Sequence, residues 1–126
     1  MLWIDRRLIT TPVYIGMAFD EKEFHRELKK LKLPLKEWPE FIPEKKDACV
    51  HRLETAGEPD VVILCIRPKS KRPLSVIVGL LVHEAAHIWQ YIRESLGEAR
   101  PSSEFEAYSM QQLSQRLVEA YYRKKK

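Results

Sequence analysis

The sequence predicts an α+β fold in which a small antiparallel β-sheet packs against a central helix and a C-terminal helix. Short runs rich in β-branched and aromatic residues surround Val13, Cys49 and Ile63, whereas the last third of the chain keeps apolar residues at helical spacing. The chain has 126 residues, enough for one domain with a hydrophobic core. We therefore expect a single domain over residues 1–126, ending in a basic tail at 123–126.

The N-terminal third predicts a strand followed by a helix. Thr11 to Phe19 is rich in β-branched and aromatic residues and ends at Asp20, a residue type that caps helix N-termini. From Glu21 to Leu33, apolar residues recur at helical spacing among charged ones, and Pro34 ends the pattern. This helix is expected to be amphipathic and half exposed.

A connection and a hairpin are predicted next. Three prolines between Pro34 and Lys46 favour an extended connection, held in place by burial of Trp38 and Phe41. Ala48 to Thr55 and Val61 to Arg67 predict two strands, because the loop between them contains Gly and Pro.

Two helices complete the chain. Pro73 suits the first position of a helix, and Gly97 suits its end. This helix is apolar on nearly all sides at first, which predicts a central position in the domain. The last helix is expected from Pro101 to about Tyr122. Its inward stripe is predicted to comprise Ala107, Met110, Leu113, Leu117 and Tyr121.

Composition narrows the classes of partner. No apolar stretch reaches the roughly 18 to 20 residues of a membrane-spanning helix, and the N-terminus lacks the order of a secretory signal, so we expect a cytoplasmic protein with no membrane partner. The formal charge is +4, but the tail at 123–126 alone supplies four positive charges. We therefore do not expect a nucleic-acid partner. Cys49 and Cys65 are expected to be free thiols in a reducing compartment.

The central helix carries the motif H-E-x-x-H, from His83 to His87. Residues four apart share one helix face, so both imidazoles can reach one tetrahedral Zn²⁺. Glu84, beside the first histidine, can take a proton from a water at the metal, which produces a nucleophile for an amide carbonyl. The predicted roles are metal ligation by His83 and His87 and general-base catalysis by Glu84.

The alternative is that the motif arose by chance around satisfied core histidines. The counts of His and Glu give about one chance in seventy for such a match in this chain. The histidines also interrupt an apolar helix, where imidazole nitrogens without partners are costly to bury. Both arguments favour zinc.

Catalytic zinc usually has three protein ligands and an open position, so a third ligand is needed. Glu104 and Glu106 are the nearest candidates in the next helix, whereas Glu94 and Glu98 are expected to be solvated. Glu106 lies nearer the inward stripe, but it has capping-box spacing from Ser103 and so also has a structural role available. The spacing leaves the choice open.

The segments LVHEAAHIWQ and PSSEFEAYSMQ resemble gluzincin metallopeptidases, which pair H-E-x-x-H with a glutamate followed three residues later by a small residue. Glu104 and Ala107 match that pattern, so the resemblance implies Glu104 as the third ligand. The matching region, about Leu81 to Gln112, looks more closely like small zincin-like proteins encoded by bacteriophages. This resemblance implies a zincin-like domain and the host cytoplasm as location. A peptide or protein substrate is expected because a single small domain leaves little room for a deep substrate pocket.

The chain departs from the gluzincin pattern at Tyr108, where many members carry Asp or Asn to orient the first histidine. Tyr108 is expected to pack as a buried aromatic beside the active helix, the alternative being a hydrogen bond to a ligand or an oxyanion. His51 faces either the cleft or solvent, and Trp89 and Gln90 have no assigned role.

Three functions are compatible with these features. The first is a zinc-dependent hydrolase, most plausibly a metallopeptidase. The second is a non-enzymatic binding module in which zinc joins two helices, and the third is a nucleic-acid-binding protein that uses the basic tail. Glu84 favours the first, because a structural zinc site has no need of a carboxylate beside an open coordination position.

Overall fold

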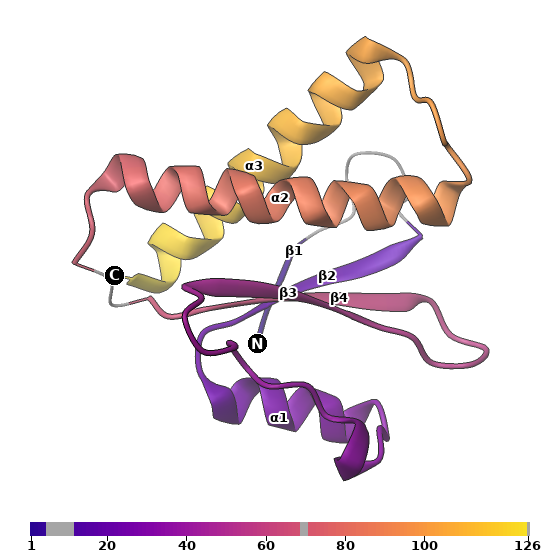
Figure 1. Ribbon diagram of the computed structural model, residues 1–126, viewed down its shortest axis with the longest axis vertical. Coiled ribbons are helices and arrows are strands. Elements are labelled where there is room, and N and C mark those ends of the chain that lie inside the picture. Colours follow the sequence, from indigo (N-terminus) through magenta and orange to yellow (C-terminus); the bar gives the residue numbers. More distant parts are fainter. Residues whose placement is uncertain (5–11, 69–70, 126) are drawn as a thin grey trace.

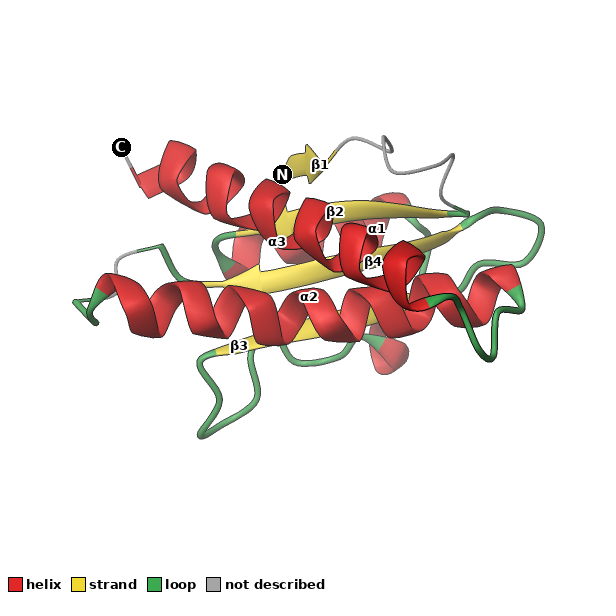
Figure 2. Ribbon diagram, turned by 90° about the horizontal axis from the view of Figure 1, so that it is seen from above, coloured by secondary structure: helices red, strands yellow, loops and turns green. Residues whose placement is uncertain are grey.

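A four-stranded β-sheet forms the middle layer of the computed structural model, which describes residues 1–4, 12–68 and 71–125 (Figure 1). The strand order is β1-β2-β4-β3. The strands are β1 (Leu2–Ile4), β2 (Val13–Ala18), β3 (Ala48–Leu53) and β4 (Asp60–Ile66). Helices α2 (Leu74–Leu96) and α3 (Ser103–Lys125) cover one face of the sheet, and α1 (Glu21–Lys30) lies on the other (Figures 1 and 2). The predicted α+β class is confirmed.

The sheet is mixed, so the expectation of an antiparallel sheet is wrong. Strands β1 and β2 pair antiparallel, as do β3 and β4, but β2 runs parallel to β4 from the pair Val13 and Asp60 to the pair Ala18 and Cys65. The reason is the connection between β2 and β4. After β2 the chain forms α1 on one face of the sheet and then β3 at the edge of the sheet. Strand β4 follows and lies between β3 and β2, where it runs parallel to β2. Thr11 and Lys126, the ends of two predicted segments, lie outside the described residues.

The two faces of the sheet pack against separate apolar clusters. The larger cluster lies between the sheet and helices α2 and α3, and it includes Ile15, Met17, Val62, Leu64, Ile77, Leu81, Ile88, Leu117 and Tyr121. The smaller cluster lies on the α1 side, and it includes Phe24, Leu28, Phe41, Leu53, Ile63 and Cys65. Strand β4 contributes to both clusters, which explains its unbroken apolar sequence.

Local signals position α1 and the connection that follows it. Asp20 caps α1 as predicted, because its carboxylate accepts a hydrogen bond from the backbone N–H of Glu23 at 2.8 Å. After the helix, a short 3-10 turn (Leu35–Glu37) leads to Trp38, whose indole N–H donates to the Leu33 carbonyl at 2.9 Å. Phe41 is buried in the α1-side cluster, so the connection is held by its aromatic rings, as expected.

Helix α2 ends as predicted, but it is less buried than expected. Gly97 adopts the left-handed conformation (φ 72°), and Glu98 N–H donates to the Arg93 carbonyl, which is a Schellman-type end. At the other end, Leu74 is 63% exposed and Val76 and Val82 are also exposed, because only one side of these first turns contacts the sheet.

The first turns of α3 rise above α2, away from the sheet (Figure 1). Leu113, Leu117 and Tyr121 of the predicted stripe are buried, whereas Ala107 is exposed in the projecting part. Phe105 and Met110 are nevertheless partly buried against the larger cluster, so α3 contacts this cluster from its first turns onward. Over the described part of the chain, no helix is both long and apolar enough to span a membrane.

Candidate metal centre

His83 and His87 lie one turn apart on α2 with their ring nitrogens facing each other. Their Nε2 atoms are 3.2 Å apart, and the rings are nearly perpendicular, at 80°. Two nitrogens that each lie about 2.0–2.1 Å from one tetrahedral zinc are separated by roughly 3.3–3.4 Å. The spacing of the two Nε2 atoms is therefore close to that of a shared metal ligand pair.

Gln90 orients the second histidine. Its Oε1 atom lies 3.2 Å from His87 Nδ1, and an amide oxygen can only accept a hydrogen bond. When His87 Nδ1 donates to this oxygen, the Nε2 lone pair of the neutral ring is left facing His83. Such a hydrogen bond to the distal ring nitrogen is typical of metal-binding histidines. The sequence assigned no role to Gln90, although its position three residues after His87 is the signal that identifies it.

Glu84 is buried beside the two histidines, with 5% of its surface exposed. Burial raises the pKa of its carboxyl group, and the nearby charges of His83, His87 and Lys46 oppose that rise. A carboxylate with a raised pKa is a stronger proton acceptor than a solvated one. The environment of Glu84 therefore suits a general base.

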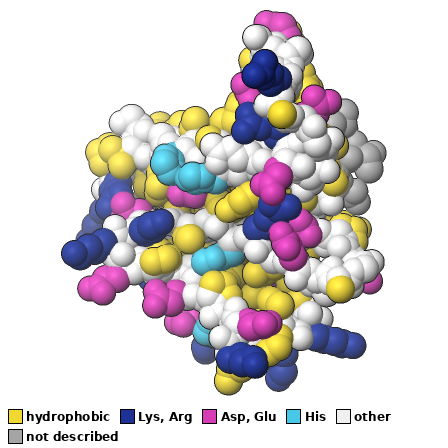
Figure 3. Space-filling view, turned by 45° about the vertical axis from the view of Figure 1, so that its right-hand side comes forward, with side chains coloured by type: hydrophobic (Ala, Val, Ile, Leu, Met, Phe, Trp, Pro, Cys, Tyr) yellow, Lys and Arg dark blue, Asp and Glu magenta, His cyan; other side chains and the backbone are white. Residues whose placement is uncertain are grey.

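A cleft of about 620 Å³ contains these groups. His83, Glu84 and His87 lie on its α2 wall, β3 forms the opposite wall at residues 48–50, and basic residues lie at one end. Figure 3 shows histidine side chains at the surface of this face, with Lys and Arg side chains around them. A larger hollow, of about 900 Å³, lies beside Trp3 and Tyr14, but it contains no histidine or cysteine. The histidine pair therefore lies in the smaller cleft.

The third predicted ligand is not beside the histidine pair. Glu104 is exposed on the first turn of α3 and does not line the cleft. Over the described residues, no group of three His, Cys, Asp or Glu side chains is arranged to hold a metal ion. The structure thus brings together His83, Glu84 and His87, and leaves Glu104 apart from them.

Glu106 has a structural partner that the sequence analysis missed. Trp89 Nε1 donates a hydrogen bond to Glu106 Oε2 at 2.8 Å, and Arg93 lies 3.7 Å from the same oxygen. The predicted capping box is wrong, because Ser102 caps α3 through its hydroxyl and carbonyl oxygens. A buried indole N–H usually has an acceptor, so Trp89 was the signal for this contact.

We predict that Glu106→Ala destabilises the metal-free protein by about 1–2 kcal/mol, because the nearly buried Trp89 N–H loses its acceptor. Glu106→Gln keeps an acceptor oxygen and should cost less. Glu104→Ala, at an exposed position, should stay within about 0.5 kcal/mol of wild type. Urea unfolding of the three variants measures these differences, and a larger loss from Glu104→Ala than from Glu106→Ala would contradict this assignment.

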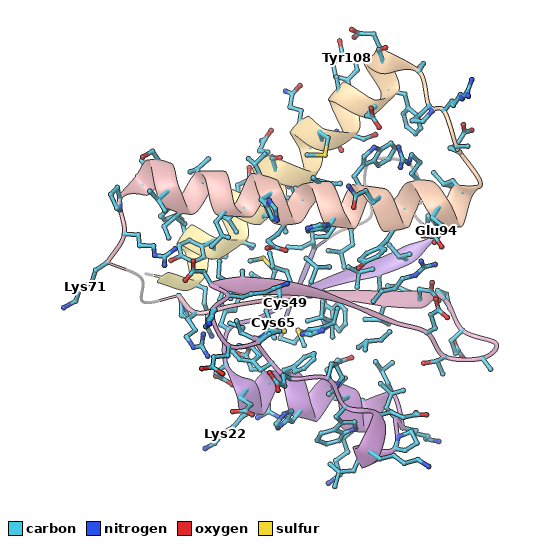
Figure 4. The ribbon with its side chains drawn as sticks, viewed as in Figure 1. Lys22, Cys49, Cys65, Lys71, Glu94 and Tyr108 are labelled. Atoms are coloured by element: carbon cyan, nitrogen blue, oxygen red, sulfur yellow. The ribbon has the colours of Figure 1, made fainter. Side chains whose placement is uncertain are left out.

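Tyr108 is exposed, so its expected burial beside the active helix is wrong. Its exposed fraction is 64%, and Figure 4 shows it near the outer end of α3, away from β3. It does not line the cleft that contains His83 and His87. The cause is the projection of the first turns of α3 above α2.

His51 and Cys65 belong to the α1 side of the sheet, whereas Cys49 lines the cleft. His51 stacks on Phe24 with ring centroids 4.9 Å apart, and its Nε2 lies 3.0 Å from the Phe41 carbonyl oxygen. Burial lowers the pKa of His51, which favours the neutral ring. It therefore lies on the α1 side, outside the cleft, and is half-buried. Cys49 on β3 and Cys65 on β4 are cross-strand partners (Figure 4), and both are free, with burial raising the pKa of each thiol.

Comparison of the chain with models of protein families, with curated proteins and with solved structures gives no match. The chemistry of His83, Glu84 and His87 is therefore the basis for assigning a function.

Proposed function

We propose that this protein is a zinc-dependent hydrolase, a gluzincin-like metallopeptidase in which His83 and His87 bind zinc and Glu84 is the general base. The observation that carries the proposal is the 3.2 Å separation of the two Nε2 atoms beside a buried carboxylate in one cleft. The donor set fits zinc, which binds imidazole nitrogen and prefers tetrahedral geometry. Bound zinc supplies an acidified water and polarises a carbonyl oxygen.

Glu84 performs the proton transfers in this proposal. Its burial raises the pKa of the carboxyl group, so the carboxylate accepts a proton from the attacking water and can later donate it to the leaving amine. His83 and His87 keep the reaction centre on the α2 wall of the cleft, and Gln90 holds His87 in the required tautomer.

A peptide substrate agrees with the position of the cleft next to a sheet edge. Among the described strands, β3 pairs only with β4, so its other edge offers backbone donors and acceptors to an extended chain. A cleft that runs along this edge suits an extended peptide better than a compact small molecule.

Glu104 remains the third ligand that we propose, on the strength of the gluzincin resemblance. Because it lies on an exposed turn of α3, it has to approach the histidines when zinc binds. Glu104→Ala should therefore weaken zinc binding more than Glu106→Ala, whose carboxylate is bound to Trp89.

The alternatives have less support. A structural zinc site is normally closed by four protein ligands, but over the described residues no group of three or more His, Cys, Asp or Glu side chains is arranged to hold a metal. Besides the two imidazoles and Glu84, the cleft contains Cys49 and Asp47, and Asp47 is paired with Arg72. A nucleic-acid function would use the basic tail, but Lys124 lies 3.7 Å from Glu23 and packs over the Phe19 ring. The site on α2 therefore supports a function more strongly than the basic tail does.

The proposal predicts zinc-dependent cleavage of peptides. The zinc-loaded protein is incubated with a mixed peptide library, and products are identified by mass spectrometry. We expect cleavage that a chelator abolishes and added zinc restores, because two imidazoles hold the metal in the cleft. Equal cleavage in chelator, or none with zinc bound, would contradict the proposed function.

A further inference from the structure

The two ends of the cleft differ in charge. Near Tyr91, the Arg52 guanidinium is compensated by carboxylates, since Nε lies 3.1 Å from Asp60 and Nη1 lies 3.1 Å from Glu94. Figure 4 shows Glu94 toward that end of α2. At the opposite end, Lys45, Lys46 and Arg72 line the cleft. The charge at this end is therefore predominantly positive.

Among the described residues, Lys45 and Lys46 at the positive end have no carboxylate at ion-pair distance. Arg72 forms a bidentate ion pair with Asp47. Asp47 is the carboxylate that lines the cleft beside Lys45 and Lys46, so its charge is already paired. Both lysine side chains are exposed. The Lys46 charge nevertheless acts on Glu84, where it opposes the raised pKa. Lys46 and Glu84 thus line the same cleft.

The backbone holds these lysines at the cleft. Residues 43–46 form a turn closed by a hydrogen bond from Lys46 N–H to the Pro43 carbonyl at 3.1 Å. Lys45 has φ 70°, in the left-handed region that Gly or Asn occupies at lower cost. A residue held in such a backbone conformation at the mouth of a cleft often has a binding role.

We propose that the cleft binds peptide segments with an acidic side chain beside the bond to be cut, and that Lys45 and Lys46 bind that carboxylate. The inference rests on the peptidase function proposed above and adds its substrate class. Val76 and Leu80 line the same end, so an apolar residue next to the acidic one is also accommodated. Two exposed lysine contacts favour the acidic peptide by about tenfold over its amide counterpart.

The test uses two fluorescent peptide pools that differ only in a central Glu or Gln, with uncharged residues elsewhere. Binding is measured on the zinc-loaded Glu84→Gln variant, and cleavage is measured on the zinc-loaded protein with Glu84. The double substitution Lys45→Gln and Lys46→Gln should reduce the roughly tenfold Glu preference to about one. The matched control, Lys22→Gln with Lys36→Gln, removes the same charge from exposed positions outside the cleft and should keep the preference.

The outcomes separate the two proposals. Equal binding of both pools, or a Glu preference that survives the Lys45 and Lys46 substitutions, overturns this inference and leaves the peptidase proposal standing. Lysine-dependent Glu preference in binding without any cleavage supports acidic-peptide binding and counts against the peptidase. A short single-stranded DNA that displaces the Glu pool through the same lysines, at lower concentration than free Glu peptide, overturns the inference in favour of a nucleic-acid site.

Discussion

Replacing either His83 or His87 by alanine is expected to lower zinc affinity by at least about 100-fold, because loss of a ligand must exceed the 10- to 100-fold effect of losing a group that only orients one. The two Nε2 atoms lie 3.2 Å apart, so each imidazole supplies one ligand atom of the proposed metal site. Zinc content after purification without chelator, followed by competition with a chromogenic chelator, measures the loss.

Two further variants serve as comparisons for the loss of zinc affinity. Gln90→Ala removes the contact to His87 Nδ1 and should weaken zinc binding by about tenfold or somewhat more. His25→Ala removes a histidine on α1 that lies near Glu21 and Trp38, and it should leave zinc binding unchanged. Wild-type zinc content and affinity in either His83→Ala or His87→Ala would rule out this metal centre.

Glu84→Gln is expected to retain zinc and the fold while lowering peptide hydrolysis by about 10²- to 10⁴-fold, because the amide keeps the shape but cannot accept a proton from water. Zinc analysis and library digestion of the same preparation measure both properties. Undiminished hydrolysis of a verified substrate by zinc-loaded Glu84→Gln would show that another group is the base.

The same substitution also has a pH signature in the metal-free protein. Burial raises the pKa of Glu84, so between its ordinary value and the raised one the native state holds more protons than the unfolded state. The stability that Glu84 contributes is present below its ordinary pKa and is lost as pH rises through the raised value. Glu84→Gln should therefore be more stable than wild type at pH 7, and this advantage should shrink as the pH is lowered toward 4.

The elements that follow from local chemistry were predicted well. Asp20 begins α1, Gly97 ends α2, and the Gly- and Pro-containing loop joins β3 to β4. Each of these features is decided within a few residues of sequence, by a side-chain cap, a left-handed backbone or a turn. The same holds for His83 and His87, whose spacing along one helix was enough to predict their proximity.

Features that depend on distant segments were missed. The three residues of β1 are too few to show a periodic pattern, and the parallel pairing of β2 depends on the route that α1 takes. Glu106 was assigned to a cap because its partner, Trp89, lies on another helix. The positive end of the cleft arises where the turn before β3 meets the start of α2, a juxtaposition that spacing does not reveal.

The parallel pairing of β2 with β4 also determines where the entropic barrier to folding lies. Val13 meets Asp60 only after α1, the proline-rich connection and β3 have been enclosed in one loop, and closing so long a loop costs more chain entropy than closing a hairpin. The segment from β3 to α2 is continuous in sequence and forms from near neighbours. The contact with the longest loop to close therefore belongs to β2, whereas His83 and His87 lie on α2, outside that loop.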